Sequence, residues 1–116
     1  MGIIRNKMII VHHYNFEEIS DMRIDAIEYF SNCLKEQDYN NYNEVAEKMI
    51  SDVLKSPLNS DYAFVIMGDC SKVGRKEEEI FDKYRRKWAK KASEKMNDVA
   101  IADIGEAWES EIEDIF

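Results

Sequence analysis

Two short apolar runs, residues 8–14 and 62–67, limit the folds open to this chain more than any other part of its sequence. The first reads Met-Ile-Ile-Val-His-His-Tyr and the second Tyr-Ala-Phe-Val-Ile-Met. β-Branched and aromatic residues favour strands, and an unbroken apolar run of this length is typical of a strand covered on both faces. We therefore expect two buried strands, each ending in a loop.

Apolar residues recur at three- and four-residue spacing between and after these runs, and this pattern predicts helices. Asn15 opens an Asn-x-x-Glu capping pattern, so the first helix is expected over residues 16–36. A second helix starts at Asn43 and is ended by Pro57, because proline disfavours a helical conformation in the residue before it. A third helix is expected from about residue 76 to 97.

The segment 99–104 has two interpretations. It is either a third short strand followed by a helix from Glu106, which we favour, or a helix interrupted at Gly105. With the third strand, helices alternate with strands, which predicts an α/β fold with right-handed crossovers and a small parallel sheet. The expected architecture is a sheet of two to three strands packed by three to four helices, or an α+β fold without the third strand.

The composition is that of a folded chain. With 116 residues, 45% of them hydrophobic, and only four glycines and one proline, residues 1–116 are expected to form a single globular domain. No apolar run is long enough to span a membrane, and the N-terminus lacks the pattern of a secretory signal, so we expect a cytoplasmic protein without membrane contact. Two cysteines, Cys33 and Cys70, are too few for a disulfide framework and are expected to be reduced.

Charge is unevenly distributed along the chain. Residues 72–95 contain ten basic and five acidic residues, whereas the rest of the chain contains six basic and nineteen acidic residues. At helical spacing one basic ridge forms, and we consider it for phosphate contact; its members are Lys83, Arg86, Lys87 and Lys90. The alternative is a solvated helix face partly neutralised by acidic residues four positions away. The net charge of −8 disfavours direct binding of nucleic acid.

The C-terminal segment from Asp98 to Phe116 contains seven acidic residues and no basic residue. Ile104, Trp108 and Ile112 recur at helical spacing with carboxylates outside their stripe, which predicts an acidic amphipathic helix. Such a helix either packs on the core and keeps the surface soluble, or binds a basic partner by imitating the charge spacing of a nucleic-acid backbone. The candidate partner-binding residues are Glu106, Trp108, Glu109, Glu111, Glu113 and Asp114.

Our leading hypothesis is a non-enzymatic protein-binding module. Its partner would be a basic protein, and the chain would act as an acidic inhibitor of a nucleic-acid-binding or nucleic-acid-processing protein. Inhibitors of this kind made by phages have a similar composition, which is an analogy and not a resemblance of residues. A further alternative is a homo-oligomeric structural or adaptor protein with an exposed Trp88 or Trp108 in its interface.

The enzymatic alternative depends on polar residues at the ends of the expected strands, where ligands bind in parallel sheets. A small enzyme or nucleotide-binding protein would use the strand-end cluster His12, Asp69, Cys70, Ser71, Lys72 and Asp103. The segment 68–74 lacks the spacing of a Walker phosphate-binding loop. His12 and His13 are adjacent in a strand and point to opposite faces, so no metal site is expected, and no motif indicates a cofactor.

Overall fold

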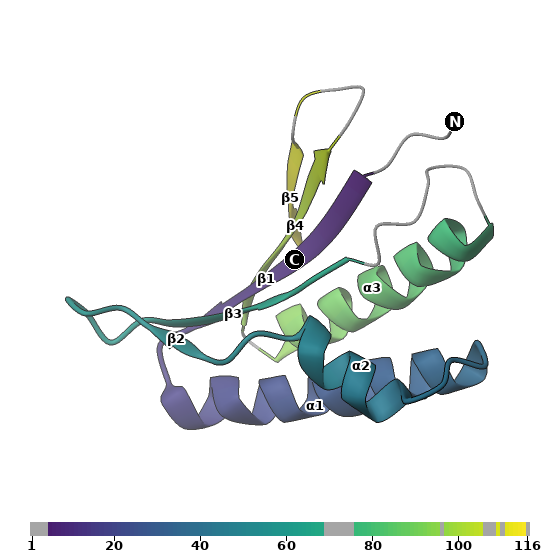
Figure 1. Cartoon of the computed structure of the whole chain (residues 1–116). Coiled ribbons are helices and arrows are strands. Elements are labelled where there is room, and N and C mark those ends of the chain that lie inside the picture. Colours follow the sequence, from purple (N-terminus) through teal and green to yellow (C-terminus); the bar gives the residue numbers. More distant parts are fainter. Residues whose placement is uncertain (1–4, 69–75, 96, 106–108, 110, 116) are drawn as a thin grey trace.

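The structure is a computed structural model of the whole chain, and it describes residues 5–68, 76–95, 97–105, 109 and 111–115. Five strands and three helices form among these residues (Figure 1). In chain order they are β1 (Arg5–His13), α1 (Phe16–Glu36), α2 (Tyr42–Met49), β2 (Leu54–Lys55), β3 (Tyr62–Ile66), α3 (Lys76–Glu94), β4 (Asp98–Gly105) and β5 (Glu111–Ile115).

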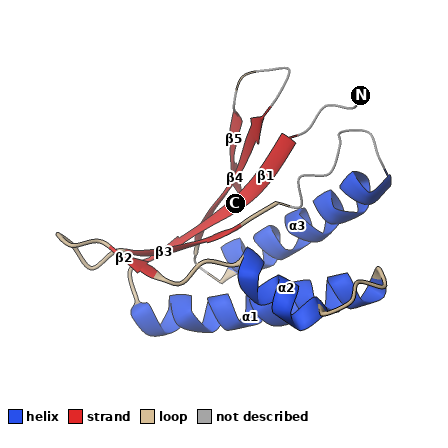
Figure 2. Ribbon diagram, viewed as in Figure 1, coloured by secondary structure: helices blue, strands red, loops and turns tan. Residues whose placement is uncertain are grey.

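The strands form one sheet in the order β2-β3-β1-β4-β5, and every neighbouring pair is antiparallel. Figure 2 shows that all three helices lie on the same side of this sheet, so the described chain has two layers. The expected parallel sheet of two to three strands is therefore wrong. The prediction was wrong about the connections between strands, and two segments of the chain account for the difference.

The first segment follows α2, which ends at Met49 and not at Pro57 as the sequence predicted. Beyond it the chain is extended and runs along β3: the Ser51 nitrogen donates to the Val65 carbonyl oxygen at 2.9 Å, and β2 then pairs with β3. This additional pass along the sheet brings the chain back to the end where β1 finishes. Consequently Tyr62 pairs with His13, and β3 runs antiparallel to β1.

The second segment is the C-terminal one. Residues 99–104 lie in strand β4, as the favoured interpretation predicted, but the helix expected from Glu106 is wrong because Glu111–Ile115 forms β5 against β4. Helix α3 does connect two strands of the same direction, β3 and β4, as a crossover would. However, β1 lies between them and is antiparallel to both, so the arrangement is a split β-α-β unit.

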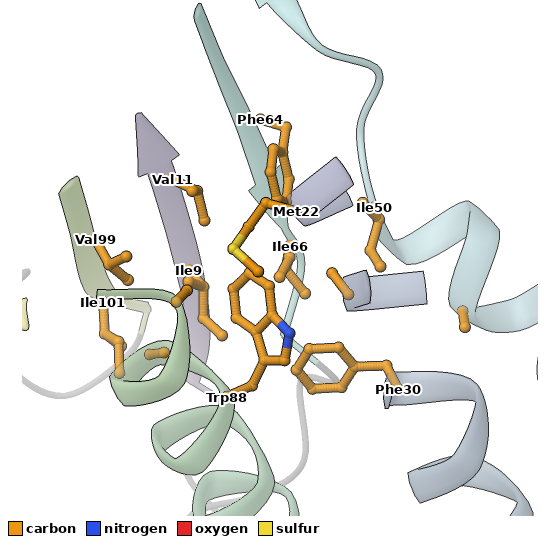
Figure 3. Close-up of a cluster of buried hydrophobic side chains, with 14 of the residues drawn as sticks. Ile9, Val11, Met22, Phe30, Ile50, Phe64, Ile66, Trp88, Val99 and Ile101 are labelled. Carbon is orange, nitrogen blue, oxygen red and sulfur yellow. The ribbon is translucent and has the colours of Figure 1, made fainter. Parts of the chain in front are cut away.

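The core lies between the sheet and the helix layer (Figure 3). Trp88 of α3 is fully buried there, and its ring packs 6.2 Å from that of Phe30 of α1 and 6.3 Å from that of Phe64 of β3. Helix α1 has the predicted bounds, and the Asn15 side-chain oxygen accepts from the Glu18 nitrogen at 3.1 Å, as the capping pattern indicated. None of the described helices is long and apolar enough to cross a membrane.

Candidate functional site

The central strand β1 is apolar on both of its faces. Successive side chains of a strand point to opposite sides of the sheet, and Ile9 and Val11 point to the helices, where each has no exposed surface. Met8, Ile10 and His12 therefore point to the other side and are partly exposed. We call this side of the sheet, away from the helices, the open face.

Apolar residues continue across the open face from strand to strand. The pairing register places Ile10 between Val65 of β3 and Ala100 of β4. One row further along, Met8 of β1 lies next to Ala102 of β4, which lies next to Ile112 of β5. The apolar members of the open face are Met8, Ile10, Leu54, Ala63, Val65, Ala100, Ala102, Ile104 and Ile112.

Three of these residues are strongly exposed for apolar side chains, most of the others are partly exposed, and Ala102 is only 3% exposed. Ile112 is 72% exposed, Leu54 is 60% exposed and Ile104 is 43% exposed. Single exposed apolar residues are ordinary, but a contiguous set on one face of a sheet marks an interaction surface. The sequence predicted a first strand covered on both faces, whereas the three helices cover only one. The open face is therefore apolar surface that no described helix covers.

One end of the open face carries a cluster of His12 and two carboxylates. The His12 Nδ1 atom lies 2.9 Å from Asp98 Oδ2, and its Nε2 atom lies 3.3 Å from Asp61 Oδ1. A carboxylate only accepts hydrogen bonds, so both contacts are hydrogen bonds when the ring donates from both nitrogens. In that state His12 has no free lone pair for a general base, and the cluster ties together the ends of three strands.

Acidic groups border the open face. Asp98 is exposed at the end next to His12, and Asp114 of β5 pairs with Ala100 and so points to the same side. Among the described strand residues that point to the open face, none is Lys or Arg. The face therefore combines an apolar centre with a negative border.

The strand-end cluster expected from the sequence is not brought together in its described part. His12 pairs with Asp98, whereas Asp103 pairs with Lys7, five residues further along β1. At about 3.4 Å per residue these positions are roughly 17 Å apart. The other four members, Asp69, Cys70, Ser71 and Lys72, lie outside the described residues. In the described part of the chain, no group of three or more His, Cys, Asp or Glu residues could hold a metal ion.

The four residues of the basic ridge are exposed on α3, and one of them is neutralised by β5. Arg86 Nη1 lies 2.8 Å from Glu113 Oε2, and its Nε atom lies 3.2 Å from Asp82 Oδ2. Burial lowers the pKa of Arg86, but the contacts with both carboxylates outweigh it and raise the pKa overall. Lys83, Lys87 and Lys90 have no ion pair with any described residue.

The C-terminal carboxylates do not form a helical stripe. Glu106 and Trp108 lie outside the described residues, and Glu109 is exposed between two such positions. Glu111 and Glu113 pair with Asp103 and Ile101 and so point to the helix side. There they line, with Lys7 and Arg86, a cavity of about 460 Å³.

The charges of β5 also have a structural explanation. β5 is an edge strand, and charged side chains on an edge oppose pairing with another sheet. Trp88 cannot serve as an interface residue in the folded chain, because it has no exposed surface.

Sequence reasoning missed the apolar residues of the open face although a signal for them was present. The first strand is apolar at consecutive positions, so one set of its side chains had to face something other than the helix layer. The sequence predicted that the chain itself would supply a cover on both sides.

Comparison with family models, curated proteins and solved structures gave no significant match for this chain.

Proposed function

We propose that this chain is a protein-binding module that docks its partner on the open face of the sheet. The observation that carries the proposal is the apolar centre of that face together with its negative border. Burial of apolar surface supplies most of the free energy in protein association, while charges at the border set orientation and partner choice. The partner is expected to present apolar side chains flanked by Lys or Arg.

Charge favours a basic partner over a second copy of this chain. A second open face would supply no described Lys or Arg for Asp114, so docking would remove water from this carboxylate without compensation. A partner with basic residues compensates that charge. Proteins that bind nucleic acid carry such surfaces, and docking there would block access of the nucleic acid. This is how the module would act as an inhibitor.

The size of the open face sets the strength of the expected contact. Six residue steps along β1 and four strand spacings give a planar footprint of roughly 400 Å². That is about half of the roughly 800 Å² that each partner buries in a standard interface. The border residues must therefore contribute, and we expect the affinity to fall as salt screens them.

Paired variants test the proposal. Ile112→Arg places a positive charge on the open face, and Asn43→Arg adds the same charge on α2, where Asn43 is exposed. Both side chains are exposed, so both variants are expected to keep the circular dichroism spectrum of the parent chain. Each protein is immobilised, incubated with cell lysate at about 0.05 and 0.5 M salt, and the retained proteins are identified by mass spectrometry.

The proposal is supported by a basic protein that the parent chain and Asn43→Arg retain at low salt and that Ile112→Arg does not. Purified partner is then titrated with each variant and with a competing nucleic acid. Loss of binding in Asn43→Arg with retention in Ile112→Arg would place the contact on the helix layer and overturn the proposal. Retention by all three proteins would do the same.

A further inference from the structure

A groove on the helix layer, apart from the open face, is rich in acceptors. Its volume is about 350 Å³, and it lies between α1 and the residues that connect α3 to β4. Four carboxylates of α1 follow one another at three- and four-residue spacing along its wall; they are Glu18, Asp21, Asp25 and Glu28. This spacing places them on one flank of the helix. Lys95 and Asn97 line the opposite wall.

The side chain of Asn97 gives independent evidence that the groove lacks a hydrogen-bond donor. Its side chain is 7% exposed, and its Nδ2 atom donates to the Ala92 carbonyl oxygen at 2.9 Å and contacts Met22 Sδ at 3.1 Å. Its Oδ1 atom is buried and accepts no hydrogen bond. Buried polar atoms are nearly always paired, so this acceptor on a residue of the groove wall indicates a donor that no described residue provides.

The carboxylates differ in how far they are already engaged. Asp25 accepts from Trp88 Nε1 at 3.0 Å and pairs with Lys91 Nζ at 3.2 Å. The remaining three, Glu18, Asp21 and Glu28, are exposed and have no ion pair with any described residue. Among the described residues that line the groove, Lys95 is the only cation. Acceptors thus exceed donors, and the groove carries a net negative charge.

We propose that this groove binds the guanidinium group of an arginine. No described group of three or more His, Cys, Asp or Glu residues could hold a metal ion, so acceptors distributed along the groove suit an extended organic cation better than a compact ion. Guanidinium presents five donors in one plane and is weakly hydrated, so its faces can pack on Met22 and Ile24 in the wall. The proposal does not depend on the function of the open face.

A titration followed by NMR tests this. The uniformly ¹⁵N-labelled full chain is titrated with N-acetyl-arginine amide, with free arginine, and with N-acetyl-citrulline amide, a neutral molecule of nearly the same shape. The expected result is a saturable shift of the Asn97 side-chain amide signals with N-acetyl-arginine amide and none with N-acetyl-citrulline amide. Equal binding of free arginine identifies a free amino acid as a sufficient ligand, whereas its failure identifies an arginine within a peptide.

Charge-neutralising variants locate the site. Asp21→Asn combined with Glu28→Gln removes two carboxylates from the groove without shortening either side chain. Because hydrogen bonds to charged groups are the stronger ones, we expect the affinity to fall by about tenfold or more. Glu44→Gln combined with Glu47→Gln makes the same change in net charge on α2, outside the groove, and is expected to alter the affinity less than about twofold.

Three results would overturn the proposal. They are an Asn97 signal that does not move, equal binding of N-acetyl-citrulline amide, and an equal loss of affinity in the α2 control. The last would show that only the net charge of the chain matters. None of these results bears on the Ile112→Arg experiment, so failure of the groove and failure of the open face are distinguishable.

Discussion

The indole nitrogen of Trp88 donates a hydrogen bond to Asp25 Oδ2 across 3.0 Å. Trp88 is the largest fully buried side chain of the core, and Asp25 belongs to the neighbouring helix. Asp25 also pairs with Lys91, one turn beyond Trp88 on α3. A single carboxylate therefore satisfies the one polar atom of the buried ring and ties α1 to α3.

We expect Asp25→Ala to lower the free energy of unfolding by about 2 kcal/mol, because it leaves the buried indole N–H without an acceptor. Asp25→Asn keeps an oxygen that can accept and is expected to lose less. Urea unfolding followed by circular dichroism measures both, with Asp21→Ala as an exposed control. Equal losses in Asp25→Ala and Asp25→Asn would show that the Lys91 ion pair matters more than the indole acceptor.

Gly68 follows β3 at a place where the backbone of β1 lies very close. Its nitrogen donates to Asn6 Oδ1 at 2.9 Å, and a Cβ atom added at Gly68 would contact that oxygen and lie 2.8 Å from the Lys7 nitrogen and carbonyl oxygen. Gly68→Ala is expected to lower the unfolding free energy by about 1–3 kcal/mol through this crowding. Adding Asn6→Ala should restore only part of the lost unfolding free energy, because the Lys7 backbone still crowds the new Cβ atom. Full recovery in thermal unfolding would contradict this account.

Strand β4 offers a test of which side of the sheet is the core. Ile101 is 4% exposed and points to the helices, whereas Ile104 is 43% exposed and lies on the open face. Ile101→Ala should lower the unfolding free energy by about 2–4 kcal/mol through lost burial and a cavity. Ile104→Ala should change it by less than about 1 kcal/mol. A larger loss for Ile104→Ala than for Ile101→Ala in chemical unfolding would mean that the core lies on the other side of the sheet.

Cys33 lies in the core, and burial raises the pKa of its thiol from 9.0 to about 11. The fold therefore favours the protonated thiol: this contribution is fully present below pH 9 and is lost as the pH rises through about 11. In a Cys70→Ser background at pH 8, thiol alkylation should be about 100-fold slower than in urea, because two pKa units separate the thiolate fractions. Equal rates would show that Cys33 is accessible as thiolate in the folded chain.

The same shift predicts a loss of stability at alkaline pH. Burial also raises the pKa of the Tyr29 hydroxyl, which lies near Cys33 and donates to the Tyr84 carbonyl oxygen at 3.1 Å. Unfolding free energy measured from pH 8 to 11 should therefore fall progressively above pH 9. Cys33→Ala should flatten this decline most clearly between pH 9 and 10, where the thiol of the unfolded chain ionises ahead of most of its tyrosines. An unchanged curve would remove Cys33 as a cause.

Local patterns were sufficient to predict several elements. The capping pattern at Asn15 and the apolar spacing after it predicted α1 with its observed bounds, and the β-branched runs predicted β1 and β3. These predictions succeeded because the deciding interactions lie within a few residues of one another: a cap accepts from the third residue, and a helix face repeats every three to four residues. The burial of Ile9 and Val11 follows from the same local pattern.

The sheet arrangement and the open face depended on contacts between distant residues. Residues 50–55 and 111–115 are compatible with a helix by spacing, yet 50–55 are extended with strand β2 at their end and 111–115 form β5, because β3 and β4 offer them unpaired backbone groups. No local pattern contains that information. The sequence by itself determined that β1 is apolar on both sides. Only the tertiary structure decided that all three helices pack on one side, because helix placement depends on the direction in which each connection returns along the sheet.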